Sequence, residues 1–136
     1  VDFTVSVAGF TDIRLSIDAA GMPTVEVENY VRAFVDSNGD GFYETPIFNF
    51  VGSNNSPYID ATLGALSGAF ATFPNISLPT PTDGIMRLRL EIFNDTQSLN
   101  EASGVDNILI TGTVPEPGSA LLALAGGFCV LRRRRR

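Results

Sequence analysis

The chain of 136 residues contains no histidine, no tryptophan and no lysine, and its only cysteine is Cys129. Without histidine, Ser-His-Asp and Cys-His catalysis are excluded, together with nearly all zinc sites. With one cysteine, the chain forms no internal disulfide, so an exported domain would depend on its core or on a metal ion for stability. The missing tryptophan counts against a strong aromatic platform for sugars.

Positive charge is scarce in the first 113 residues. They hold four arginines against fourteen Asp and Glu residues, which leaves a net charge of −10. Nucleic acid is therefore excluded as a partner, because its binding depends on neutralising phosphates. Such an acidic body is suited instead to holding divalent cations or to staying soluble through self-repulsion.

The last 23 residues differ sharply from the rest. A Pro-x-Pro spacer precedes the apolar run Ala120–Leu131, which predicts a short C-terminal hydrophobic helix. At about 1.5 Å per residue this run spans roughly 18 Å, against a hydrocarbon core of about 30 Å. It is thus a poor permanent anchor, and the arginines that follow stay on the cytoplasmic side and leave the body outside. The motif residues are Val114, Pro115, Glu116 and Pro117, followed at the end by Arg132, Arg133, Arg134, Arg135 and Arg136.

This order of motif, apolar stretch and arginine cluster resembles the PEP-CTERM sorting signal of Gram-negative bacteria that make exopolysaccharide. The resemblance implies a transient stay in the inner membrane. It also implies an exosortase-type protease as partner, cleavage near Pro-Glu-Pro, and release to the cell surface or extracellular matrix. A simple C-terminal tail anchor or an interfacial segment is the alternative.

Period-two alternation of apolar residues recurs through the body and predicts strands. The clearest case is Ile85–Phe93, and Thr24–Val35 is a long strand-like run with a bulge near Asn29. Pro74 restricts the segment Phe70–Leu78 to a sheet edge or a break. We expect an all-β, antiparallel two-sheet sandwich of seven or eight strands in residues 1–113, followed by the sorting tail at 114–136. Because export needs a signal peptide, we expect the start at Val1 to reflect truncation or processing.

The segments Arg87–Phe93 and Gly104–Ile110 resemble the final two strands of exported bacterial jelly-roll domains. In several carbohydrate-binding members an Asp on the last strand helps to ligate a structural calcium ion. The resemblance implies a jelly-roll-like topology and gives that role to Asp106.

The segment Asp36–Glu44 has oxygen-bearing side chains at alternate positions followed by a glycine, which is the pattern that a calcium ion requires. Asp36, Asn38 and Asp40 are the first candidate ligands, and Glu44 can supply another. The twelve-residue loop pattern then fails, since its last position is Ile47 rather than Glu. A hairpin turn, with Asn-Gly and Asp-Gly chosen for their backbone freedom, is the alternative. If calcium binds here, we expect it to be structural.

Three functions remain open for the body. The first is a non-catalytic surface or matrix component that associates with exopolysaccharide in a biofilm. The second is a carbohydrate-binding module, for which Tyr43 and Tyr58, both flanked by turn residues, are the surface candidates. The third is the accessory C-terminal domain of a larger exported enzyme. Catalysis by paired carboxylates needs no histidine, but no spacing in the sequence selects a pair.

Overall fold

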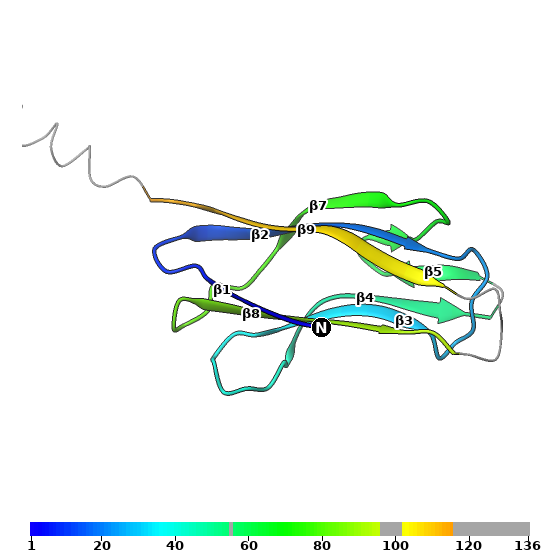
Figure 1. Cartoon of the computed structure of the whole chain (residues 1–136), viewed down its shortest axis with the longest axis horizontal. Coiled ribbons are helices and arrows are strands. Elements are labelled where there is room, and N and C mark those ends of the chain that lie inside the picture. The colour runs from blue at the N-terminus through cyan, green and yellow to red at the C-terminus, as the bar shows by residue number, and fades with distance from the viewer. Residues whose placement is uncertain (55, 96–101, 116–136) are drawn as a thin grey trace, which may run out of the picture.

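The computed structural model describes residues 1–54, 56–95 and 102–115. Within these ranges the protein is all β, and nine strands form two antiparallel sheets that lie one above the other (Figure 1). The predicted two-sheet, all-β architecture is therefore confirmed. The strands are β1 (Asp2–Ser6), β2 (Thr11–Gly21), β3 (Tyr30–Asp36), β4 (Thr45–Ser53), β5 (Ser56–Asp60), β6 (Gly64–Ala65), β7 (Ala71–Ser77), β8 (Ile85–Phe93) and β9 (Ser103–Thr113).

The larger sheet has the strand order β1-β8-β3-β4-β5-β6, and the smaller one has the order β7-β2-β9. Strands β3 to β6 follow one another as hairpins, whereas the chain crosses between the sheets before and after β2 and β7 and again before β9. The ninth strand, one more than predicted, is explained by β6, which has only two residues. The predicted C-terminal helix falls in residues 116–136, outside the described residues. No helix in the described part of the chain is long and apolar enough to cross a bilayer.

The core lies between the two sheets and follows the alternation of the sequence. On β2 every second residue from Ile13 to Ala19 is buried, and on β8 the same holds for Met86, Leu88 and Leu90. Full burial of one large apolar side chain contributes about 1.5–3 kcal/mol. From the other strands the core receives Val31, Ala33, Val35, Phe48, Phe50 and Tyr58.

The predicted strand Thr24–Val35 is correct only in its second half. Residues 26–29 form a turn, in which the Asn29 N–H donates to the Glu26 carbonyl oxygen, and β3 begins at Tyr30. The Asn29 side chain is fully buried, and the backbone carbonyl oxygen of Asn29 accepts a hydrogen bond from the Gly52 N–H. Val25 forms an isolated antiparallel bridge with Ser56, whereas Val27 lies in the turn and its side chain is 59% exposed. The expected bulge near Asn29 is a turn that starts the strand.

The prediction for Pro74 is confirmed. Strand β7 is the edge of the three-stranded sheet and pairs only with β2. The register shifts between Leu15 and Ile17, opposite Pro74 and Asn75, and Asn75 has a φ of 59°. Because proline lacks the N–H that a ladder needs, the strand accommodates it with a bulge at the edge.

Candidate functional site

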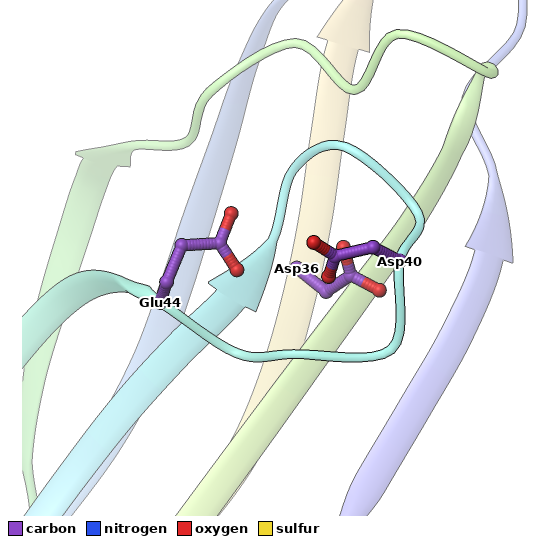
Figure 2. A group of neighbouring side chains, drawn as sticks. All are labelled: Asp36, Asp40 and Glu44. Atoms are coloured by element: carbon purple, nitrogen blue, oxygen red, sulfur yellow. The ribbon is translucent and has the colours of Figure 1, made fainter.

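The loop between β3 and β4, residues 37–44, brings three acidic side chains together. One carboxylate oxygen from each of Asp36, Asp40 and Glu44 lies within 4.8 Å of the others (Figure 2). Asp36 is the last residue of β3 and is buried, whereas Asp40 and Glu44 are exposed. The arrangement is local, because a short loop between paired strands returns the chain beside its own starting point.

Asp36 organises the loop through both of its carboxylate oxygens. The Gly39 N–H donates to Oδ1 at 2.7 Å, and the Gly41 N–H donates to Oδ2 at 3.0 Å. Burial raises the pKa of Asp36, but these two hydrogen bonds and the nearby charge of Arg87 outweigh it, so the pKa lies below its ordinary value. Both glycines have positive φ, 79° and 90°, which other residues rarely adopt. The buried carboxylate is therefore ionised and fixes the turn.

The other side chains of the loop continue this local network. The side-chain oxygen Oδ1 of Asn38 accepts from the Asp40 N–H, and the side-chain Nδ2 of Asn38 donates to Asp40 Oδ2 at 3.0 Å. Asp40 Oδ1 accepts from the Phe42 N–H, and Glu44 accepts from the Ser37 hydroxyl. The Asn38 side chain is thus hydrogen-bonded within the loop, both to the backbone and to Asp40, and it remains a predicted ligand beside the three carboxylates.

The donor set of the cluster fits a calcium ion. Calcium takes oxygen ligands at about 2.3–2.6 Å, so two ligands on opposite sides of an ion are about 4.8 Å apart. The three carboxylates satisfy this limit. Each oxygen retains a lone pair beside the hydrogen bond that it accepts, so ligation and turn formation are compatible. Loop formation by hydrogen bonds alone explains the same geometry, which is why the cluster by itself does not identify a metal site.

Asp106, the fifth predicted ligand, is not brought to this cluster. It lies on β9 in the smaller sheet, opposite Asp18 of β2, and its carboxylate accepts the N–H of Asn107. Asp18 accepts hydrogen bonds from Thr72 of β7 and Asn107 of β9, and the pKa of Asp18 is lowered by these contacts. The Asp18 side chain therefore links β2 to both of its neighbours, β7 and β9, by hydrogen bonds.

The two tyrosines predicted at the surface have different environments. Tyr43 lies in the β3–β4 loop and is half-buried, and the Arg89 guanidinium carbon is 4.0 Å from its ring centre. Arg89 is in turn held by Asp2 through two hydrogen bonds of 2.8 Å. One face of the Tyr43 ring is therefore occupied by a cation, and contacts with a ligand are left to its remaining surface.

The prediction that Tyr58 is a surface residue is wrong, because its side chain is fully buried. On β5 the alternation turns Tyr58 inward and leaves Ile59 exposed. Its hydroxyl donates to Asn94 Oδ1, and its ring lies against Gly21, where a Cβ would be 2.5 Å from Tyr58 Cδ2. Turn residues on both sides of Tyr58 suggested exposure, but the strand between them is paired on both edges.

Of the sorting motif, the structure describes Val114 and Pro115, which follow directly after β9. Val114 is 61% exposed. Glu116, Pro117 and the arginines Arg132 to Arg136 lie outside the described residues.

Sequence reasoning missed a cavity of about 530 Å³ beside the start of β1. Its lining combines apolar residues of both sheets with the ion pair of Arg32 and Glu91, whose Nη2 and Oε2 are 2.7 Å apart. The Arg32 guanidinium also lies 4.0 Å from the ring centre of Tyr30, which stacks on Phe93. Tyr30 and Arg32 of β3 lie opposite Phe93 and Glu91 of β8. Alternation along each strand cannot reveal this pairing, because it depends on the register between the two strands.

Comparison with known proteins gives no match: no family model, no curated protein and no solved structure is significantly similar to this chain.

Proposed function

We propose that this is an exported, non-catalytic surface or extracellular-matrix protein, sorted through its C-terminal tail and associated with exopolysaccharide. The observation that carries the proposal is the order of Val114–Pro117, the apolar run and Arg132–Arg136, which resembles a PEP-CTERM signal. Strand β9 ends at Thr113 and Val114 is exposed, so the motif begins where the sheet ends. This position is favourable for access by a sorting protease of the exosortase type.

In this proposal, the tail determines on which side of the inner membrane the body of the protein lies. Each arginine at the centre of a bilayer costs roughly 2.5–3.5 kcal/mol on insertion scales, so five in a row resist transfer. The apolar run enters the inner membrane, the arginines remain in the cytoplasm, and the body stays outside until cleavage releases it. The high negative charge of the body then keeps the released protein soluble in a hydrated matrix.

Calcium bound by Asp36, Asp40 and Glu44 is a structural part of this proposal. The cluster brings three carboxylates together at the end of β3 and in the loop that follows, and the positive charge near them comes from Arg87, which acts on Asp36. An ion there cross-links the end of β3 to the start of β4 and stabilises the folded state by mass action, by about 2.7 kcal/mol when its concentration is 100 times the dissociation constant.

We propose, more specifically, that the two-sheet sandwich has a jelly-roll-like topology. The nested antiparallel pairs β1–β8 and β2–β7 support it, because such nesting is what rolling a long hairpin produces. The consecutive hairpins from β3 to β6 depart from a regular jelly roll.

The absence of catalysis is supported by the uses that the carboxylates already have. Asp60 accepts three backbone N–H groups, from Asn49, Thr62 and Leu63, and Glu91 is paired with Arg32. Together with the lack of histidine, this leaves these two groups with structural roles rather than with a proton to transfer.

Sorting is tested by producing the full chain behind a signal peptide in an exosortase-bearing host and in the same host without exosortase. We expect a shortened, released protein only in the first host. Deletion of Arg132–Arg136 should abolish this processing, whereas replacement of the five arginines by lysine, which keeps the charge, should preserve it in large part. Equal processing in both hosts, or unchanged release after the deletion, would contradict the proposal.

A defined carbohydrate site is a second candidate, favoured by the cavity beside β1. It offers the Tyr30 ring together with Arg32 and Glu91, whose polar atoms can bind hydroxyl groups. A saturable preference for one glycan that is lost in Tyr30→Ala and kept in Tyr30→Phe would support this candidate over general matrix association.

A further inference from the structure

Three connections of the fold, β1–β2, β3–β4 and β7–β8, meet at the end of the sandwich where β9 finishes. The Val7 N–H in the β1–β2 turn donates to the Gly84 carbonyl oxygen, and the Thr82 N–H donates to that of Ser37 in the β3–β4 loop. Thr11 pairs with Thr113, the last residue of β9. We call this end, made of residues 7–11, 37–44, 78–84 and 113–115, the exit end, because the chain leaves it toward the tail. It is the end of Figure 1 at which the orange part of the chain lies.

The exit end exposes large apolar side chains. Phe42, in the β3–β4 loop, is 73% exposed, and Phe10, which contacts Gly112 of β9, is 39% exposed. Val114 is 61% exposed. The rest of the domain therefore leaves these three side chains in contact with solvent at the end from which the tail departs.

The tail places this end close to the membrane. Only four residues lie between Pro115 and Ala120, where the apolar run begins, so the two are five residue steps apart. A fully extended chain spans at most about 3.6 Å per residue, so the exit end stays within roughly 18 Å of the point at which the run enters the lipid. The opposite end, where Phe70 lies against Gly104, is separated from it by the length of β2 and β9.

We propose that the exit end docks on the phospholipid surface while the tail is inserted, with Phe42 and Phe10 in contact with the lipid. This inference rests on the proposed function, because it requires the tail to enter the bilayer. It adds a defined orientation, in which the exit end contacts the membrane and the opposite end of the sandwich points away from it.

The charges of the exit end select the kind of lipid. Its charged residues are Asp40, Glu44 and Asp83, of which Asp83 forms an ion pair with Arg87 of β8, so the exit end is negative. An acidic surface is repelled by anionic headgroups and accepts zwitterionic ones. The contact is therefore apolar in origin, and phosphatidylcholine vesicles are the appropriate probe.

The chain itself offers two site-specific reporters. It contains no tryptophan, so Phe42→Trp, Phe10→Trp and Phe70→Trp each carry a single indole, and Phe70, 58% exposed, is the matched control. Its only cysteine, Cys129, lies in the apolar run and accepts a polarity-sensitive fluorophore that reports tail insertion independently.

The experiment reconstitutes the full chain into phosphatidylcholine vesicles with brominated acyl chains. We expect the Cys129 label to report an apolar environment. Emission from Phe42→Trp and Phe10→Trp should shift to shorter wavelength and be quenched several-fold more strongly than that from Phe70→Trp. In the Phe10→Trp chain, the further change Phe42→Asp should reduce quenching toward that of the control.

Two outcomes would overturn the inference and are distinguishable. If the Cys129 label reports insertion while Phe42→Trp is quenched no more than Phe70→Trp, the docking is wrong and the tail proposal stands. If the Cys129 label stays in water, both fail together.

Discussion

The Arg89 guanidinium lies over the ring of Tyr43, with its central carbon 4.0 Å from the ring centre, and Asp2 holds it there with two hydrogen bonds. A residue of β8 thus fixes the side chain of the loop that carries the acidic cluster. An exposed cation–π contact of this kind is worth about 0.5–1 kcal/mol. It fixes the orientation of the tyrosine ring and occupies one of its faces.

The first prediction concerns exopolysaccharide association through Tyr43. Tyr43→Ala removes the ring and should lower retention of the full chain on exopolysaccharide from a PEP-CTERM-bearing bacterium several-fold in co-sedimentation. Tyr43→Phe keeps the ring and the contact with Arg89, and should retain most of the binding. Equal retention of the alanine variant and the unchanged protein would exclude this loop as a contact site.

The second prediction separates a calcium site from a simple turn. Asp40 and Glu44 are exposed, so Asp40→Asn with Glu44→Gln should leave the melting temperature in chelator almost unchanged, since the amides keep an acceptor oxygen. The increase in melting temperature that calcium produces in the unchanged protein should disappear. A thermal melt in calcium and in chelator makes the measurement.

The matched control for that experiment is Asp36→Ala. It leaves the N–H groups of Gly39 and Gly41 without their acceptor, so it should lower the melting temperature with and without calcium. If the unchanged protein melts at the same temperature in calcium and in chelator, the loop is a turn and the calcium proposal is wrong.

The third prediction concerns stability in acid. The pKa values of Asp36 and Asp60 are lowered from the ordinary value of 3.8, since hydrogen bonds from backbone N–H groups outweigh the effect of burial. Near pH 3.8 the unfolded chain therefore binds more protons than the folded one. The two ionised carboxylates contribute fully to stability above this pH, and their contribution is lost as the pH falls through the lowered pKa values. Urea unfolding should show a loss of stability beginning below about pH 5.

Asp60→Asn should make that acid-dependent loss smaller, at the expense of lower stability at neutral pH. A midpoint of unfolding that already declines between about pH 7 and pH 6, where histidine would titrate, would contradict the assignment, because the chain has no histidine.

The fourth prediction concerns the contact that starts β3. A Cβ on Gly52 would collide with the carbonyl oxygen of Glu26, so Gly52→Ala must move the backbone of the turn at residues 26–29. We expect a loss of more than about 2 kcal/mol, the range of severe strain. Gly68→Ala meets no atom within 4 Å and should change stability by less than about 1 kcal/mol in chemical denaturation. Similar values for both variants would show that the turn is not packed as described.

The features that could be predicted from the sequence depend on neighbouring residues. Alternation located Ile85–Phe93 with its exact bounds, since one buried face imposes a period of two on a strand. Pro74 marked an edge because a missing N–H acts on its own strand. The carboxylates of Asp36, Asp40 and Glu44 came together as expected, because their separation along the chain is shorter than one hairpin loop. The tail motif is likewise a matter of order and composition alone.

Tertiary structure decided what depends on partners far apart in the chain. It placed Tyr58 in the core against Gly21, and Asp106 in the other sheet opposite Asp18. It interrupted the strand predicted from Thr24 onward, because the backbone of the buried Asn29 accepts a hydrogen bond from Gly52 and β3 begins only after it. It also gathered Phe10 and Phe42 at the end where β9 finishes. Such contacts follow from strand order and register, and the same alternating pattern is compatible with many orders, so only the folded chain selects one.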